Sequence, residues 1–182
     1  MDGLLLHRLL PGLPDEVRVG AGQQRSLVLG TRAEARLCAD LITGLDEPPA
    51  NAAVETSGPV RLVPAEGGLL PHLTVLGNIL HGHIATHRVT REAADKQCRL
   101  TANNCDLDDV LHRYPHEITP GRRRLAGLAR AVRADPSVIV LEDAPGLPTW
   151  GSLLRPDNIT ELWSIALVLI TTDAERAKAF DR

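Results

Sequence analysis

Aromatic residues are scarce in this 182-residue chain, which contains two tryptophans, one tyrosine and one phenylalanine. None precedes Tyr114, so the segment before it offers no aromatic ring for stacking on a ligand. The three cysteines, Cys38, Cys98 and Cys105, are odd in number and lack zinc-site spacing, which favours a reducing cytoplasmic compartment over a disulfide framework. No run has the apolar length of a membrane span, and the first residues do not read as a signal peptide.

The composition is that of an ordinary soluble domain. Hydrophobic residues make up 43% and charged residues 24% of the chain, enough for one domain with a real core. The formal net charge of -3 argues against bulk binding of nucleic acid.

Apolar periodicity predicts strands that alternate with helices. Strands are expected over 26–29, 60–63, 138–141 and 165–170, and helices over 31–44, 120–135 and 173–180. The segment 73–114 is expected to be mostly helical, with starts near Thr74, Thr90 and Asp106, and 46–59 is expected to be a loop. The order predicts a parallel α/β core that carries a helical insertion.

The most informative segment is Tyr114 to Pro145. Thr119 is a good N-cap, and Pro120 suits the first helical position, where no N–H is needed. The helix that follows has an apolar face and a set of arginines: Arg122, Arg123, Arg124, Arg130 and Arg133. A short strand rich in β-branched residues then ends on Glu142 and Asp143, at the edge where open α/β sheets bind ligands.

This segment resembles the part of an ATP-binding-cassette (ABC) ATPase that runs from the signature helix to the Walker B strand. A second stretch, Leu-Pro-His-Leu-Thr-Val-Leu-x-Asn at 70–78, resembles the region of importer-type cassettes that faces the coupling helix of the membrane subunit. The resemblance extends from about Val17 to Asp181-Arg182, where a working domain continues into further strands. It implies one domain over 1–182: a P-loop NTPase-like core of mainly parallel strands (17–72 and 115–182), a helical subdomain (73–114) and a reduced β-subdomain.

At the phosphate-loop position, however, most of the expected residues have changed. The family's G-x-x-x-x-G-K-[ST] presents backbone N–H groups, a lysine and a hydroxyl to phosphates and Mg²⁺. Here Gly30 is kept, but Ala35, Arg36 and Leu37 replace the second glycine, the lysine and the hydroxyl. Thr31 and Glu34 instead form a capping-box pattern, which would put a carboxylate where a phosphate binds.

The other positions of the ABC motifs are altered as well. Ala65 replaces the glutamine of the Q-loop, and Thr172 replaces the switch histidine. The signature motif reads Ile118-Thr119-Pro120-Gly121-Arg122, so only Thr119, Gly121 and Arg122 remain as candidates for phosphate contact. Glu142 and Asp143 stand in the reverse of the family's order. We therefore expect no catalytic residues, no bound ATP or Mg²⁺, and no metal.

Two further patterns have simpler interpretations. His81, His83 and His87 include an i, i+4 pair, but no acidic or cysteine ligand lies at suitable spacing, which favours solvated helix histidines over a metal site. The arginines of 122–133 are equally consistent with a solvated basic face and with a site for an anion or an acidic partner.

Three functional hypotheses follow. In the first, the chain is a non-hydrolysing accessory or regulatory subunit that docks through Leu69–Ile79 on a permease coupling helix or a partner ATPase subunit, in the cytoplasm or at the inner face of the cell membrane. In the second, it is a divergent ATPase subunit that uses ATP and Mg²⁺ with Arg36, Glu142 and Asp143. In the third, it is a scaffold outside transport, whose face at 122–133 binds an acidic partner or nucleic acid, although nucleic acid is disfavoured.

Overall fold

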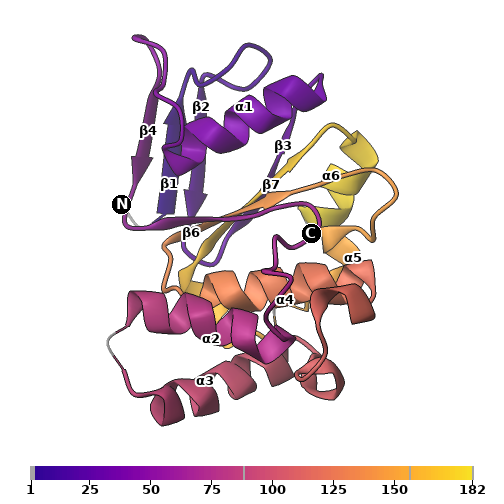
Figure 1. Ribbon diagram of the computed structural model, residues 1–182. Coiled ribbons are helices and arrows are strands. Elements are labelled where there is room, and N and C mark those ends of the chain that lie inside the picture. Colours follow the sequence, from indigo (N-terminus) through magenta and orange to yellow (C-terminus); the bar gives the residue numbers. More distant parts are fainter. Residues whose placement is uncertain (1–2, 88, 156, 182) are drawn as a thin grey trace.

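The computed structural model describes residues 3–87, 89–155 and 157–181 (Figure 1). Arg182 and both ends of the predicted domain lie outside these ranges. The strands are β1 (Gly3–His7), β2 (Glu16–Gly20), β3 (Gln24–Val28), β4 (Ala53–Thr56), β5 (Val60–Val63), β6 (Val138–Glu142) and β7 (Ala166–Thr171). The helices are α1 (Arg32–Thr43), α2 (Val75–Thr86), α3 (Arg91–Asn104), α4 (Pro120–Val132), α5 (Trp150–Leu153) and α6 (Ala174–Phe180). Short 3₁₀ turns cover Asp108–Val110, Pro115–Glu117 and Thr160–Ser164.

The larger sheet is the predicted parallel one, with strand order β3-β7-β6-β5. Successive residues of its central strand β6 point to opposite faces, as a strand requires. Ile139 and Leu141 join the core under α2, α3 and α4, whereas Val138 and Val140 join the core under α1. The sheet is therefore buried on both faces, with α1 above it and the other helical layer below it in Figure 1.

A second, antiparallel sheet has the order β2-β1-β4 and packs with α1. It pairs Leu4 with Val19 and Leu6 with Val17. The prediction of a loop over 46–59 was wrong, because β4 lies inside that segment and pairs with β1. That pairing joins segments about fifty residues apart. Residues 53–56 (Ala-Val-Glu-Thr) have too little alternation of apolar and polar side chains to predict a strand.

Helix boundaries follow the predicted caps. Thr31, Thr74, Thr90 and Thr119 each accept a hydrogen bond from a backbone N–H of the first turn, which fixes the starts of α1 to α4. Gly44 ends α1 in the left-handed conformation with φ 74°. The third expected start, near Asp106, leads only to the 3₁₀ turn Asp108–Val110. In the described part of the chain, no helix is long and apolar enough to cross a membrane.

Candidate functional site

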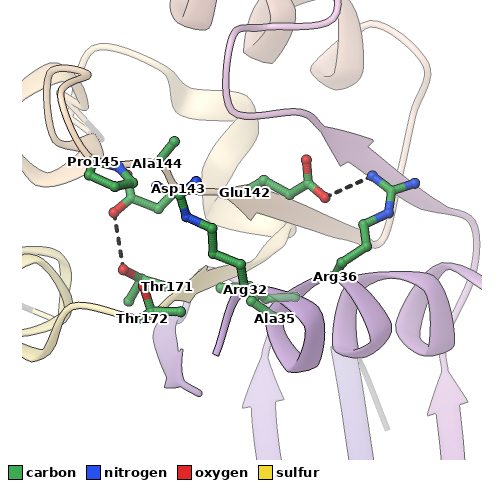
Figure 2. Close-up of a pocket in the computed structure, with 10 residues that line it drawn as sticks. Arg32, Ala35, Arg36, Glu142, Asp143, Ala144, Pro145, Thr171 and Thr172 are labelled. Carbon is green, nitrogen blue, oxygen red and sulfur yellow. Dashed lines mark hydrogen bonds and ion pairs between the residues drawn. The ribbon is translucent and has the colours of Figure 1, made fainter. Parts of the chain in front are cut away.

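A cavity of about 350 Å³ lies between the first turn of α1 and the carboxyl ends of β6 and β7 (Figure 2). Its lining residues are Arg32, Ala35, Arg36, Glu142, Asp143, Ala144, Pro145, Ile170, Thr171 and Thr172. The fold thus brings Arg36, Glu142, Asp143 and Thr172 together from three separate segments. The other sequence candidates, Gly30, Leu37, Ala65, Thr119, Gly121 and Arg122, are not among these lining residues.

The start of α1 is closed by its own side chains. Only residues 29–31 separate β3 from α1, so the segment that would form a phosphate loop is helical instead. Thr31 Oγ1 accepts the Glu34 N–H at 3.2 Å and donates to Glu34 Oε2 at 3.0 Å. A Cβ atom at Gly30 would lie 3.1 Å from the same Oε2. The Glu34 carboxylate therefore lies over Gly30, at the positive helix terminus that an anion would use.

Glu142 is paired with Arg36, the residue that the sequence resemblance places at the phosphate-loop lysine position. Arg36 Nη1 donates to Glu142 Oε1 at 3.1 Å (Figure 2). Arg36 Nε donates to Asp40 Oδ2, also at 3.1 Å. The hydrogen bond to Asp40 and the charge of Glu142 raise the pKa of Arg36. The Arg36 side chain is 56% exposed, so this ion pair is solvated on one side.

Asp143 is buried, with 3% of its side chain exposed, and both of its oxygens are occupied. Oδ1 accepts from Arg124 Nη2 at 3.2 Å and from Arg176 Nη2 at 2.6 Å. Oδ2 accepts from Thr171 Oγ1 at 3.1 Å and from Arg176 Nε. The carboxylate at the strand end thus holds α4 and α6 to the sheet, and no lone pair is left facing the cavity.

Burial and charge act in opposite directions on this cluster. Burial disfavours the ionised form of Asp143, but hydrogen bonds and charge from Arg176, and then a hydrogen bond from Arg124, outweigh it and hold the pKa of Asp143 below its ordinary value. The hydrogen bond to Asp143 raises the pKa of Arg176, whereas burial lowers the pKa of Arg124. Two guanidinium groups therefore share one carboxylate in a poorly solvated place.

The surroundings of Arg124 offset part of the cost of its complete burial, although its Nε has no hydrogen-bond partner among the described residues. Its Nη2 donates to the Glu142 carbonyl at 3.1 Å, and its Nη1 donates to the Pro148 carbonyl. The guanidinium carbon lies 4.3 Å from the centre of the Trp150 ring, a cation–π arrangement. Trp150 Nε1 also donates to the Glu142 carbonyl, at 2.9 Å.

Residues of the signature-like turn, 118–122, contact other parts of the chain. Arg122 Nη1 donates to Asp109 Oδ1 at 2.7 Å, and Gly121 is buried where a Cβ atom would lie 3.2 Å from Leu153. Several arginines of the segment 122–133 make contacts within the chain. Arg123 donates to the carbonyls of Pro115 and Ile118, and Arg133 donates to Gln97. These contacts disfavour a broad basic surface for nucleic acid.

Ala65 lies half-buried in a turn that packs directly on α4. The Gly67 N–H donates to the Pro64 carbonyl at 2.8 Å, and Gly67 has φ 89°. A Cβ atom at Gly127 of α4 would overlap the Gly67 carbonyl oxygen. The turn and the helix are therefore in backbone contact, which only glycine permits.

The interpretation of solvated histidines was wrong for His83. This side chain is 2% exposed, with Nδ1 3.1 Å from the Arg133 carbonyl oxygen and its ring 4.5 Å from that of His87. Burial lowers the pKa of His83. Over the described ranges, no three histidine, cysteine or acidic side chains gather as metal ligands. The periodicity missed this burial because α2 is apolar on several faces.

Relatives of this chain are import proteins of ABC systems. It is 26% identical to the Fe(3+) ions import ATP-binding protein of Yersinia enterocolitica, over 95% of this chain and 53% of that one. It is 28% identical to the taurine import ATP-binding protein of Pseudomonas fluorescens, over 92% of this chain and 69% of that one. The chain thus spans about half the length of the iron-import relative. No protein-family model matches it.

Solved structures agree on the fold. A metal-chelate type ABC transporter in an inward-facing conformation superposes with a TM-score of 0.72 at 18% identity, covering 99% of this chain and 77% of that one. A dimeric bacterial ABC transporter cassette, MJ0796, gives a TM-score of 0.72 at 16% identity, covering 97% and 91%. The chain is a homologue of ABC nucleotide-binding domains. The expected P-loop NTPase-like fold is confirmed.

In this homologue of ABC domains, ion pairs of Arg36 with Glu142 and of Arg124 and Arg176 with Asp143 lie at the strand ends beside the cavity. Arg176, which pairs with Asp143, and Trp150, which stacks on Arg124, were not among the candidates found in the sequence. Arg124 was named there only as one of the arginines of 122–133, not as a partner of Asp143. A signal for Arg124 existed, because it lies four residues before the core residue Leu128 and so shares its buried face. Arg176 gave no such signal, because its helix α6 is short and follows β7, whereas Asp143 follows β6.

Proposed function

We propose that the chain is a non-hydrolysing homologue of ABC nucleotide-binding domains that serves as an accessory or regulatory subunit. The observation that carries this proposal is the locked carboxylate of Asp143, which accepts four hydrogen bonds from protein side chains. A carboxylate that polarises water or binds Mg²⁺ needs free lone pairs toward the ligand. Releasing Asp143 would leave the buried guanidinium of Arg124 uncompensated.

The residues present do not fit Mg-ATP at the other positions either. Glu34 places negative charge over Gly30, and Leu37 has no hydroxyl for a cation. Arg36 is already paired with Asp40 and Glu142. Each of these changes weakens phosphate or metal binding by itself, and together they support a loss of nucleotide binding.

The altered phosphate-loop and signature positions together make the role of an accessory subunit more specific. The family resemblance implies head-to-tail pairs, in which one subunit supplies the phosphate loop and the other the signature. In this chain the phosphate-loop position is helical, and the signature-like Arg122 is paired with Asp109. Such a chain would leave both sites of a pair inactive, whichever subunit it joined. We therefore assign its role to binding rather than turnover.

The surface proposed for partner binding is Leu69–Ile79. Asn78 organises its turn, since its side chain accepts the Leu70 N–H at 2.7 Å and donates to the Leu70 carbonyl at 3.1 Å. Val75 is fully buried, so it belongs to the core and is not available to a partner. Leu69, Leu70 and Leu73 are half-buried beside the exposed Pro71 and His72. This leaves a small apolar surface around residues 70–73 for a partner.

The partner we propose is a permease coupling helix or a partner ATPase subunit, which would place the chain in the cytoplasm or at the inner face of the cell membrane. In the same proposal, the P-loop NTPase-like core comprises 17–72 and 115–182, and the helical subdomain 73–114. The iron and taurine relatives are named as import ATP-binding proteins, which supports a role in an import system.

A divergent, active ATP-binding subunit is the second candidate. It is favoured by one observation, the cavity of about 350 Å³ that Arg36, Glu142 and Thr172 line at the strand ends. In that case ATP and Mg²⁺ would bind there, with Arg36 leaving Glu142 for a phosphate.

Thermal denaturation with Mg-ATP separates the two candidates. A ligand at about 100 times its Kd stabilises the native state by ~2.7 kcal/mol, which corresponds to a rise in Tm of several degrees. We expect no such rise with millimolar Mg-ATP compared with Mg²⁺ alone, and no release of phosphate above background. A clear rise in Tm, or release of phosphate above background, would establish the active subunit instead.

A further inference from the structure

The three longest helices of the layer below the sheet in Figure 1, α2, α3 and α4, meet at a buried polar cluster. His83, in the last turn of α2, is 2% exposed. Arg133, at the end of α4, contacts His83 through Nη2 and also donates to Gln97 Oε1 of α3 at 2.7 Å. None of these three side chains lines the cavity at the strand ends.

The imidazole of His83 faces two groups that make opposite demands on one nitrogen. Nδ1 lies 3.1 Å from the Arg133 carbonyl oxygen and 3.2 Å from Arg133 Nη2. A protonated Nδ1 can donate to the carbonyl but points its hydrogen at a guanidinium donor, whereas an unprotonated Nδ1 accepts from Nη2 but faces the carbonyl lone pairs. The other nitrogen, Nε2, is buried and has no hydrogen-bond partner among the described residues. Neither neutral tautomer therefore satisfies all the groups at this ring.

A second proton on His83 would create a cation beside Arg133. The imidazolium would face the guanidinium across the 3.2 Å between Nδ1 and Nη2, where little water can screen the two charges. Burial lowers the pKa of His83, and the charges of Arg133 and His87 lower it further.

The other charged groups around His83 do not offset this repulsion. Asp95 of α3 pairs with Arg99 at 2.6 Å, and burial raises the pKa of the Cys98 thiol to about 11, so that Cys98 stays neutral. Within the described residues, no acidic side chain forms an ion pair with His83. The elements packed around His83 carry these titratable and charged groups: His81 and His87 on α2, Asp95, Lys96, Cys98 and Arg99 on α3, Arg130 and Arg133 at the end of α4, and Asp135 after it.

Helix α3 is the element that this cluster can release at the smallest cost. Its buried residues have small side chains: Ala94, Cys98, Thr101 and Ala102. They remove little apolar surface from water, whereas α2 and α4 bury leucine, isoleucine and valine side chains. Within the described residues, side chains tie α3 to distant segments through the Arg133–Gln97 hydrogen bond and through Thr101 Oγ1, which donates to Glu161 Oε1 at 2.9 Å. Opening of α3 therefore costs less free energy than global unfolding.

We propose that His83 is a proton-sensitive contact that holds α3 in place. When His83 takes up a second proton, Arg133, which is half-buried, moves into solvent and loses its hydrogen bond to Gln97. Helix α3 then opens locally, while the sheet and α4 stay folded. This inference is independent of the proposed function, because it concerns packing within the helical layer and needs no nucleotide.

Hydrogen exchange of the intact chain tests this, measured by mass spectrometry at pH 7.5 and 5.5 and corrected for the intrinsic pH dependence of exchange. In an opened α3, His83 has its ordinary pKa of about 6.5, so the open population rises by up to about tenfold between these pH values. We expect the protection of α3 amides to fall several-fold, within that limit. It should depend little on urea below the unfolding transition, because one helix exposes little surface, whereas the protection of β6 amides should decrease steeply with urea.

His83→Leu and His83→Gln, both neutral at either pH, should each abolish the pH effect on α3. Arg133→Gln removes the opposing cation and should weaken the effect. His81→Leu is the matched control, because His81 is an exposed histidine on the same helix, and it should leave the effect unchanged. The Tm of every variant confirms folding.

Equal corrected protection of α3 at the two pH values would overturn the proposal. So would the same pH effect in the two His83 variants, or an unchanged effect in Arg133→Gln. A urea dependence of α3 exchange as steep as that of β6 would show that the helix opens only by global unfolding, which would overturn the local opening.

Discussion

Substituting Asp143 by asparagine should destabilise this protein strongly, because the carboxylate balances two guanidinium groups. The Asp143 side chain is 3% exposed and that of Arg124 is fully buried. The substitution keeps the size of the side chain but removes its charge, and it replaces one acceptor oxygen by a donor NH₂. That donor would face Arg176 or Thr171, both of which now donate to Asp143.

The magnitude follows from leaving a buried charge without its partner, which costs about 3–5 kcal/mol. For a domain of this size, 1 kcal/mol corresponds to about 2–4 °C in Tm, so a decrease of roughly 6–20 °C is expected. The effect should also depend on pH. Because the pKa of Asp143 is lowered on folding, its contribution is complete above the unfolded-state value of about 3.9 and is lost as the pH falls below it.

Urea denaturation of the purified chain, followed by circular dichroism, measures this loss. The matched control is Glu142→Gln at the neighbouring position. Its carboxylate pairs with Arg36, which is 56% exposed, so a loss of less than about 1 kcal/mol is expected. If the free energy of unfolding of Asp143→Asn lies within about 1 kcal/mol of that of the unchanged chain, the carboxylate of Asp143 does not hold the two guanidinium groups in place. That result would indicate that Asp143 is available for a ligand, as in an active site.

Three further outcomes are expected. Leu70→Asp should abolish binding to the partner while changing the free energy of unfolding by less than ~1 kcal/mol. If this variant is unfolded, Leu70 belongs to the hydrophobic core and not to a docking surface. Folding lowers the pKa of His83, so as the pH falls below about 6.5 this histidine is protonated first in the unfolded chain, which destabilises the folded state. The urea midpoint should therefore decrease less steeply with falling pH in His83→Leu than in the unchanged chain. Gly127→Ala should lower stability by at least ~1–3 kcal/mol, because its Cβ atom would overlap the Gly67 carbonyl. Gly58→Ala should leave stability unchanged, because its Cβ atom would lie 3.4 Å from the nearest atoms, those of Ser137. Equal melting temperatures of the Gly127→Ala and Gly58→Ala variants would refute the close packing of Gly127 on Gly67.

The sequence predicted much of the fold because its local signals agree with the tertiary structure. Threonine caps before α1 to α4 and the β-branched run of β6 set these elements before any packing is considered. Strand β4 was missed because its partner β1 lies far away in the chain, and pairing over such distances leaves no local pattern.

The sequence by itself determined which groups stand at the carboxyl edge of the sheet: two carboxylates at the end of β6, no lysine before α1, and a threonine-capped start of α1. Only the tertiary structure decided what those carboxylates do. Arg124, Arg176 and Asp143 come from α4, α6 and the end of β6, and their contact depends on how the three elements pack. Whether a carboxylate is free or locked depends on such long-range burial and pairing, because charges separated in sequence interact strongly only when folding removes the water between them.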